Sequence, residues 1–429
     1  MGDGMESAGP SELVEDLFRR EWTHLVAALV RLLGPAQLAL AEDLVHDSLL
    51  SALQAWQLGP PDDAKAWLLQ TAKHRAIDRI RRDRRFEAAR PELGSEWTLA
   101  RAVELALSPE ADAENQLALM FAICDEALSP ETHVTLILRL LCGLSAAEIA
   151  RAFLVDVQTI DRRLHRARTR LEQLSELGDP RSAAELRARQ PSLEQALYLL
   201  FNEGYHGASA EAPLQPATCA DALRLAELLL SLDAEARPRV HALAALFCFN
   251  SARLATRVDD EGVFLPLGEQ DRSRWNRDLL ERGIRHLGSS AEGATLTRWH
   301  LEAGIAFEHT RAPSVRETDW ERIVAYYDAL LGLAPSPVVA LNRGLALAEL
   351  QGLDAGRAAL AALTDEPKLA TYSFFWAGRA DIERRAGRNV EARAFYQRAA
   401  VCARSAAERR SYERRLREFE LCSVRRPDR

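Results

Sequence analysis

The chain has 429 residues and a formal net charge of −8, and 48% of its residues are hydrophobic. This length exceeds one ordinary domain, so we expect roughly two to four. The six cysteines form neither a CxxC pair nor a Cys/His spacing suited to zinc, which predicts reduced thiols and no metal site. No apolar run reaches membrane-spanning length, and the acidic N-terminus lacks a signal-peptide core, so we expect a soluble cytoplasmic protein without membrane partners.

Helical patterns run along most of the sequence. Apolar residues recur at intervals of three and four, and alternating β-branched runs are nearly absent, which predicts an all-α protein. Proline- and glycine-rich breaks and one acidic stretch divide the chain into two small helical domains, a linker between them and a long helical extension. The predicted parts are residues 1–87, 88–113 (the linker), 114–178 and 179–429.

The first of two arginine-rich stretches, residues 72–85, lies on a predicted helix that begins near Ala64. The expected buried stripe of this helix is Leu69, Ala72, Ala76 and Ile80. Because the whole chain is acidic, such clustering of arginines indicates a surface for phosphates. The candidate DNA-binding residues are Lys73, His74, Arg75, Asp78, Arg79, Arg81 and Arg82.

The helix expected before it, residues 41–56, is amphipathic and acidic. Its predicted inward residues are Val45, Leu49, Leu53 and Trp56. Glu42 with His46, and Asp43 with Asp47, form i,i+4 pairs that we expect to face outward. An exposed acidic helix is usually only solvated, but this one could also dock a basic protein partner.

The second basic stretch belongs to a predicted helix-turn-helix. Ser145 and Glu148 form a capping box that opens its first helix, and a short turn over residues 154–156 precedes the second. The second helix has an expected apolar stripe of Ile160, Leu164, Ala167 and Leu171. A helix that is apolar on one side and basic on the other can lie in the major groove, although a solvated surface helix has the same pattern. The candidate DNA-binding residues are Gln158, Thr159, Arg162, Arg163 and Arg166.

Three stretches in this order resemble an extracytoplasmic-function (ECF) sigma factor, a sigma-70 family subunit of RNA polymerase. They are AEDLVHDSLLSALQAW (41–56), AKAWLLQTAKHRAIDRIRR (64–82) and LSPETHVTLILRLLCGLSAAEIARAFLVDVQTIDRRLHRARTRL (128–171). The resemblance implies a sigma-2 domain in residues 1–87, which binds the polymerase clamp and the −10 promoter element. It also implies a helix-turn-helix sigma-4 domain in residues 114–178, which binds the −35 element and the polymerase flap.

The same resemblance implies a protein that is not an enzyme and needs no cofactor, because polymerase performs the chemistry. The implied core-polymerase contacts are Glu42, Asp43, Leu44, His46 and Asp47. The first basic helix would bind the −10 element, and the second would bind the −35 element. The sequence departs from the family pattern at two places: His46-Asp47 replaces the usual Gln-Glu, and Asp161 replaces a usual cation. Because of Asp161, the family's choice of −35 bases does not carry over to this chain.

The extension contains an internal repeat: Gly344 and Ala346 recur 34 residues later as Gly378 and Ala380. A 34-residue helical period is typical of tetratricopeptide (TPR) repeats, whose stacked helices bind peptides or neighbouring domains. The extension also resembles that of an ECF subgroup with a TPR-like C-terminal domain, through LFNEGY (200–205) and EQDRSRW (269–275). We therefore expect a regulatory region that binds the sigma domains, polymerase or a small regulatory protein.

The candidate motif residues of the extension are Asn202, Glu203 and Tyr205. They could line a catalytic pocket with Asp271 and Arg272, but a structural role in helix capping and packing is favoured. A further alternative for the whole chain is a helix-turn-helix regulator with a sensing domain that acts without polymerase. The segment 41–82 argues against it, because such a regulator has no need of an acidic docking helix before a second basic helix.

Overall fold

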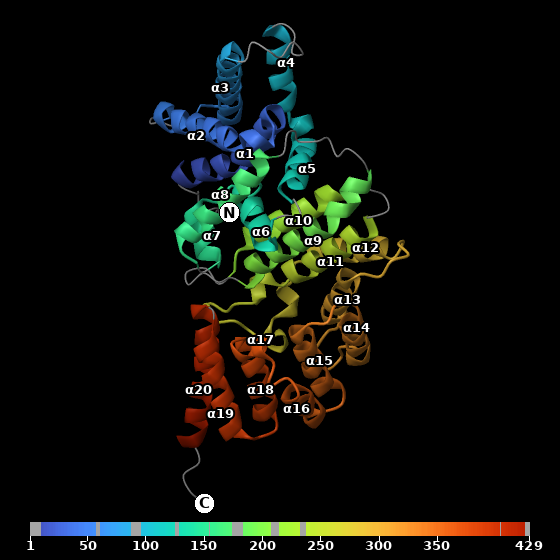
Figure 1. Ribbon diagram of the computed structural model, residues 1–429. Coiled ribbons are helices and arrows are strands. Elements are labelled where there is room, and N and C mark those ends of the chain that lie inside the picture. The colour runs from blue at the N-terminus through green and yellow to red at the C-terminus, as the bar shows by residue number, and fades with distance from the viewer. Residues whose placement is uncertain are drawn as a thin grey trace, which may run out of the picture. The chain divides into compact units, whose positions relative to one another are not determined.

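The computed structural model describes residues 10–56, 61–86, 96–124, 128–153, 155–173, 183–206, 214–231, 237–403 and 405–424. Within these ranges the chain is helical and has no strand beyond an isolated bridge between Val258 and Phe264, which confirms the all-α class (Figure 1). In the part that the structure describes, no helix is long and apolar enough to cross a membrane. The chain divides into an N-terminal unit, Met1–Leu200, and a C-terminal unit, Phe201–Arg429.

The N-terminal unit is built around its first helix, α1. Leu25, Val26, Leu29 and Val30 of α1 are fully buried. They lie on the helix that contacts α2, α3, α4, α5 and α6. The bounds of these helices are α1 (Pro10–Leu33), α2 (Leu38–Ala55), α3 (Ala64–Phe86), α4 (Glu96–Ala106), α5 (Asp112–Ile123), α6 (Pro130–Leu140), α7 (Ala146–Phe153) and α8 (Val157–Glu172).

Part of the predicted linker is helical. The acidic segment has no sustained apolar stripe, yet it contains α4, which lies beside α3 (Figure 1). Val103 of α4 and Leu107 after it are buried, and Lys73 of α3 lies 3.4 Å from the carboxylate of Glu104. Two apolar side chains are enough here because α1 and α3 provide the surface that buries them. The predicted domain boundaries themselves stay predictions.

The C-terminal unit is a series of helices, and the longest described connection, residues 252–276, lies between α11 and α12. Consecutive pairs in contact include α11 with α12, α15 with α16, and α18 with α19. The bounds are α9 (Ala183–His206), of which only the residues from Phe201 on belong to this unit, α10 (Pro216–Leu229), α11 (Arg237–Ser251), α12 (Arg277–Ser290), α13 (Arg298–Arg311), α14 (Trp320–Leu333), α15 (Pro337–Leu350), α16 (Leu353–Ala361), α17 (Pro367–Ala370), α18 (Ser373–Arg385), α19 (Asn389–Cys402) and α20 (Ala406–Val424).

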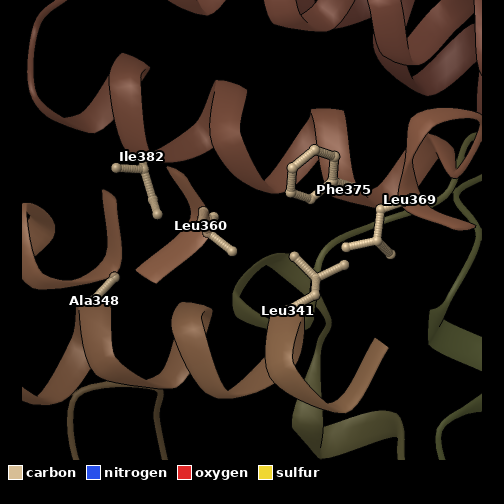
Figure 2. Close-up of a cluster of buried hydrophobic side chains, with 6 residues drawn as sticks. All are labelled: Leu341, Ala348, Leu360, Leu369, Phe375 and Ile382. Atoms are coloured by element: carbon tan, nitrogen blue, oxygen red, sulfur yellow. The ribbon is translucent and has the colours of Figure 1, made fainter. Parts of the chain in front are cut away.

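The 34-residue repeat falls on two of these helical hairpins, α15–α16 and α18–α19. Its glycines allow close approach: a Cβ on Gly344 would lie 3.0 Å from Leu360, and one on Gly378 would lie 3.0 Å from Leu345. Figure 2 shows the core between the hairpins, to which α15, α16, α17 and α18 all contribute. Its buried side chains are Leu341, Ala348, Leu360, Leu369, Phe375 and Ile382.

Candidate nucleic-acid interface

Helix α8 has the two-sided character that the sequence predicts. Its four stripe residues, Ile160, Leu164, Ala167 and Leu171, are all buried. Asp156 caps the helix: its carboxylate accepts the backbone N–H of Thr159 at 2.7 Å and the Thr159 hydroxyl at 3.0 Å. These bonds from Thr159 are the main reason that the pKa of Asp156 is lowered. The cap fixes where the helix begins and therefore which residues lead its exposed face.

The predicted −35 residues are not equally available. Gln158, Arg162 and Arg166 are exposed, whereas Thr159 and Arg163 are half-buried. Thr159 is engaged in the cap, and the Arg163 guanidinium lies 5.7 Å from the centre of the Phe153 ring. The face therefore offers an amide and two arginines, which are donors suited to base edges and phosphates.

The capping box that precedes this helix is also confirmed. The Ser145 hydroxyl accepts the backbone N–H of Glu148 at 3.2 Å, and the Glu148 carboxylate accepts the N–H of Ser145 at 2.7 Å. Before it, in the turn after α6, Gly143 has φ of 68°, in the left-handed region that favours glycine. The sequence thus specifies the turn chemistry of this segment locally.

On α3 the described basic residues are exposed or half-buried, and some of them are engaged in contacts. Arg75 donates to the Ser51 hydroxyl at 2.7 Å and lies 3.6 Å from the Asp47 carboxylate, so it ties α3 to α2. His74 shares a hydrogen bond with Gln70 at 2.9 Å. His74, Asp78 and Arg79 are exposed, Lys73, Arg75 and Arg81 are half-buried, and the side chain of Arg82 lies outside the described residues.

The buried stripe of α3 differs from the prediction. Leu68, Ala72, Ala76 and Ile77 are buried, whereas Leu69 and Ile80 are only half-buried. The predicted helix itself is confirmed, and Asp63 caps it by accepting the N–H of Ala66 at 2.8 Å. Both stripes fit a helical period, and the contacts with α1 and α2 decide between them.

The acidic helix α2 presents Asp43, His46 and Asp47 to solvent, as expected, while Leu44 is buried. Leu53 is 52% exposed and Leu50 is 42% exposed, so the expectation that Leu53 points inward is wrong. Leu49 and Trp56, which were expected inward together with Leu53, do pack with Leu68 of α3. The outer face of α2 therefore combines carboxylates with exposed leucines.

Glu42 does not face outward. It is only 4% exposed, which corrects the prediction from its i,i+4 pairing with His46. Its carboxylate accepts hydrogen bonds from Arg139 Nε of α6 at 2.9 Å and from Arg168 Nη2 of α8 at 2.7 Å. These partners are 97 and 126 residues away in sequence. A local pattern cannot reveal such partners, although Arg139 is the only charged residue in the apolar run 134–144.

Of the extension motif, Tyr205 is packed into the fold. Asn202 and Glu203 are half-buried and Tyr205 is buried at the end of α9. Arg257, which sequence reasoning missed, lies 3.6 Å from the centre of the Tyr205 ring and donates to the Tyr205 carbonyl at 2.5 Å. Burial lowers the pKa of Arg257. Aromatic and guanidinium stacking of this kind stabilises a helix end.

Asp271 and Arg272 also cap helices. Asp271 accepts the backbone N–H of Ser273 at 3.0 Å. Arg272 donates to the carbonyls of His309 and Ala312 at 2.5 and 2.8 Å, at the end of α13. Burial, followed by the charges of Arg253 and Arg272, lowers the pKa of His309 to about 3. Among the described residues no cluster of His, Cys, Asp or Glu could hold a metal ion. These contacts favour the structural interpretation of the motif.

Three known protein families match successive parts of this chain. Residues 17–86 match the family described as Sigma-70 region 2, and residues 125–171 match Sigma-70, region 4. Residues 189–291 match a family of unknown function, DUF6596. A protein of Rhizobium meliloti (strain 1021), described as uncharacterized protein R00370, is 33% identical over 374 residues, which cover 86% of this chain and 88% of the relative. No solved structure matches the chain.

Proposed function

Because this chain belongs to the sigma-70 family as an ECF-like sigma factor with a DUF6596 extension, we propose that it binds core RNA polymerase and directs it to specific promoters. Its role in transcription initiation follows from regions 2 and 4, and such factors are not enzymes. The observation that carries the finer proposal is the presence of two separate exposed basic helices, α3 and α8, in one N-terminal unit. A regulator that binds only duplex DNA needs one of them.

The exposed face of α8 is proposed to read the −35 element. Gln158 and Arg162 lie in the first turns, where a recognition helix meets base edges, and Arg166 lies one turn further along for phosphate contact. Arg162 lies 3.9 Å from the capping carboxylate of Asp156, which holds its side chain near the helix start. Arginine at this place suits the acceptors of guanine.

Helix α3 is proposed to hold the melted strand of the −10 element. Single strands are bound by basic grooves together with stacking side chains. Arg79 and His74 are exposed on the helix, and Trp67 near its start is half-buried at 5.4 Å from the centre of the Trp56 ring. Asp47 and Ser51 orient Arg75, so the acidic helix α2 also positions the basic one.

The outer face of α2 is proposed to dock on the polymerase clamp. Asp43, His46 and Asp47 provide polar contacts, and Leu50 and Leu53 provide exposed apolar area beside them. Interfaces commonly combine an apolar centre with a polar rim in this way. The C-terminal unit is proposed to regulate promoter access by binding the sigma domains, polymerase or a small regulatory protein through its stacked, TPR-like helices.

Run-off transcription with purified core polymerase tests the proposal. We expect core-dependent transcripts from the full chain, and a loss of at least about tenfold for the Arg162→Ala, Arg166→Ala variant, because each good base contact contributes about 1–3 kcal/mol. Arg101→Ala is the matched control, because Arg101 is an exposed arginine of α4 outside the proposed DNA faces. A chain ending at Leu200, first checked for helix content, should give an altered transcript level if the extension regulates.

Two results would contradict this proposal. Tight binding of duplex DNA without any core-dependent transcript would favour a regulator that acts without polymerase. Equal transcript levels from the full chain and the folded shortened chain would remove the regulatory role of the extension while leaving the initiation role in place.

A further inference from the structure

Three arginines gather in the connection between α11 and α12, and we call them the arginine cluster. Arg253 and Arg257 flank the short helix η3 (Leu254–Thr256), and Arg272 begins η5 (Arg272–Arg274). All three side chains are half-buried, and none of them forms an ion pair within the ranges that the structure describes. Such an arrangement is uncommon, because a charge without a counter-charge is costly to remove from water.

Aromatic rings bring the three guanidinium groups together. Those of Arg253 and Arg272 lie 5.7 and 4.7 Å from the centre of the Trp275 ring, and that of Arg257 lies over the Tyr205 ring. Burial, followed by the charge of Arg253, lowers the pKa of both Arg257 and Arg272, which is consistent with neighbouring positive charges. Tyr205 ends the stretch LFNEGY and Trp275 ends the stretch EQDRSRW, so two motifs that are distant in sequence meet at the arginine cluster.

Carboxylates of the same connection bond outside the cluster. Asp259 pairs with Arg414 and Glu269 pairs with Arg415, and both of these partners belong to α20. Asp271 is exposed and bonds within its own turn. The fold thus directs these acidic groups away from the three arginines.

The arginine cluster also has unused hydrogen-bond donors. A guanidinium group has five N–H donors, but Arg257 donates through Nη1 to the Tyr205 carbonyl and Arg253 donates through Nε. Arg272 donates to two carbonyls through Nη1, whereas its Nη2 and the nearby His309 Nδ1 are buried without a partner among the described residues. Because a buried donor without an acceptor costs free energy, an acceptor group at this place would be bound favourably.

A phosphate group has the chemistry that these donors require. Guanidinium groups bind phosphate oxygens through charge-assisted and often paired N–H bonds. A phosphate monoester carries a charge of about −1.5 to −2 at neutral pH, so it compensates more of three positive charges than one carboxylate does. Because the three side chains are half-buried, a small molecule fits the cluster better than a nucleic-acid backbone, which requires an open groove.

We propose that the arginine cluster binds the phosphate group of a small-molecule ligand. Tyr205 and Trp275 orient the guanidinium groups, and the phosphate oxygens accept N–H bonds that the protein itself leaves unused. A bound phosphate would join η3 to η5 and thereby stabilise the connection between α11 and α12. The inference goes beyond the proposed function, because binding of this ligand requires neither polymerase nor DNA.

Titration calorimetry of the full chain with inorganic phosphate, at constant ionic strength, tests the site. We expect saturable binding with a Kd below about 1 mM. Arg253→Gln should weaken this binding at least about tenfold, because it removes a charged donor. Arg253→Lys keeps the charge and should retain more of the affinity than Arg253→Gln. The absence of saturable binding by the wild type would overturn the proposal.

Arg398→Gln is the matched control. Arg398 of α19 is exposed, and its guanidinium group lies 5.6 Å from the centre of the Trp376 ring, which resembles the distance of Arg253 from Trp275. The substitution therefore makes the same change in net charge and removes a similar ring contact. The affinity for phosphate should stay at the wild-type value. Equal losses from Arg398→Gln and Arg253→Gln would show a general effect of charge and would overturn the site.

Hydrogen exchange locates the bound phosphate without any substitution. In the wild type, phosphate should slow the exchange of backbone amides in residues 252–276 and leave that of α3 and α8 unchanged. Protection confined to α3 and α8 would place the phosphate on the proposed DNA-binding faces and would overturn the arginine cluster as its site. This measurement decides the question even if Arg253→Gln lowers the helix content.

Two further ligands distinguish the source of the phosphate group. Phenyl phosphate is a small monoester, whereas a single-stranded oligonucleotide carries phosphate in a polymer. Arg253→Gln should weaken the binding of phenyl phosphate and leave the affinity for the oligonucleotide unchanged. An equal loss for the oligonucleotide would assign the cluster to nucleic acid and overturn the small-molecule site. Because no measurement here involves polymerase, failure of the phosphate site leaves the initiation role standing, and failure of core-dependent transcription leaves the phosphate site standing.

Discussion

The His24 imidazole illustrates how single residues organise the N-terminal unit. It lies in α1, with one ring nitrogen 2.9 Å from the Asp112 carboxylate and the other 3.1 Å from the Leu107 carbonyl. Burial opposes its charge, but the hydrogen bond and charge of Asp112, with the Leu107 carbonyl, raise the pKa of His24 above its usual value. Both nitrogens face acceptors, so the doubly protonated ring fits the site.

This raised pKa makes stability depend on pH. The folded form binds the proton more tightly than the unfolded form, so the stabilisation is complete below the unfolded pKa and is lost as pH rises through the folded pKa. We expect the free energy of unfolding of the N-terminal unit, from urea melts between pH 6 and 8.5, to fall with pH for this reason. His24→Gln should remove that slope and cost about 1.5–3 kcal/mol at pH 6, the usual value of hydrogen bonds to a charged group. An equal slope in both proteins would contradict the assignment.

At the scale of whole helices, close packing depends on a few glycines. Gly204 in α9 faces α10, where an added Cβ would lie 2.9 Å from both the Cys219 sulfur and the Gln215 carbonyl. Gly288 in α12 has nothing within 4 Å of the same position. The two residues share a helical backbone and differ in the space around them.

Alanine at these two glycines should therefore act in opposite directions. Gly204→Ala should lower the free energy of unfolding by about 1–3 kcal/mol, because the helices must separate to admit the methyl group. Gly288→Ala should raise it by about 0.5–1 kcal/mol through helix propensity. Urea denaturation followed by circular dichroism measures both. A higher free energy of unfolding for both variants would contradict this, because it would show that a methyl group fits between α9 and α10 without separating them.

Features of whole helices also differ in how far the sequence could predict them. The α8 stripe and the capping box of Ser145 and Glu148 depend on neighbouring residues, and both are confirmed. The stripe of α3, the burial of Leu107 after α4 and the position of Glu42 depend on partners far along the chain. Periodicity allows several faces of a helix to be buried, and only the assembled fold selects one.

The chain divides into two compact units, and each of the four buried clusters around Leu341, Ile323, Tyr396 and Ala52 holds residues of one unit alone. Two units with their own cores can unfold as two cooperative events. We expect scanning calorimetry of the full chain to resolve into two transitions. His24→Gln should shift one of them and Gly204→Ala the other, because these residues lie in different units and share no partners. A single transition moved by both variants would show instead that the units unfold together.

The cluster around Glu42 has a consequence for how such factors can be recombined. Its carboxylate comes from one region and its two guanidinium groups from another, so neither region carries the complete arrangement. A chimaera that joins this region 2 to the region 4 of a relative without both arginines would bury an unpaired carboxylate. Such a hybrid would have a lower free energy of unfolding even if each of its two regions folded normally. Substitutions at these three positions would therefore have to be made together.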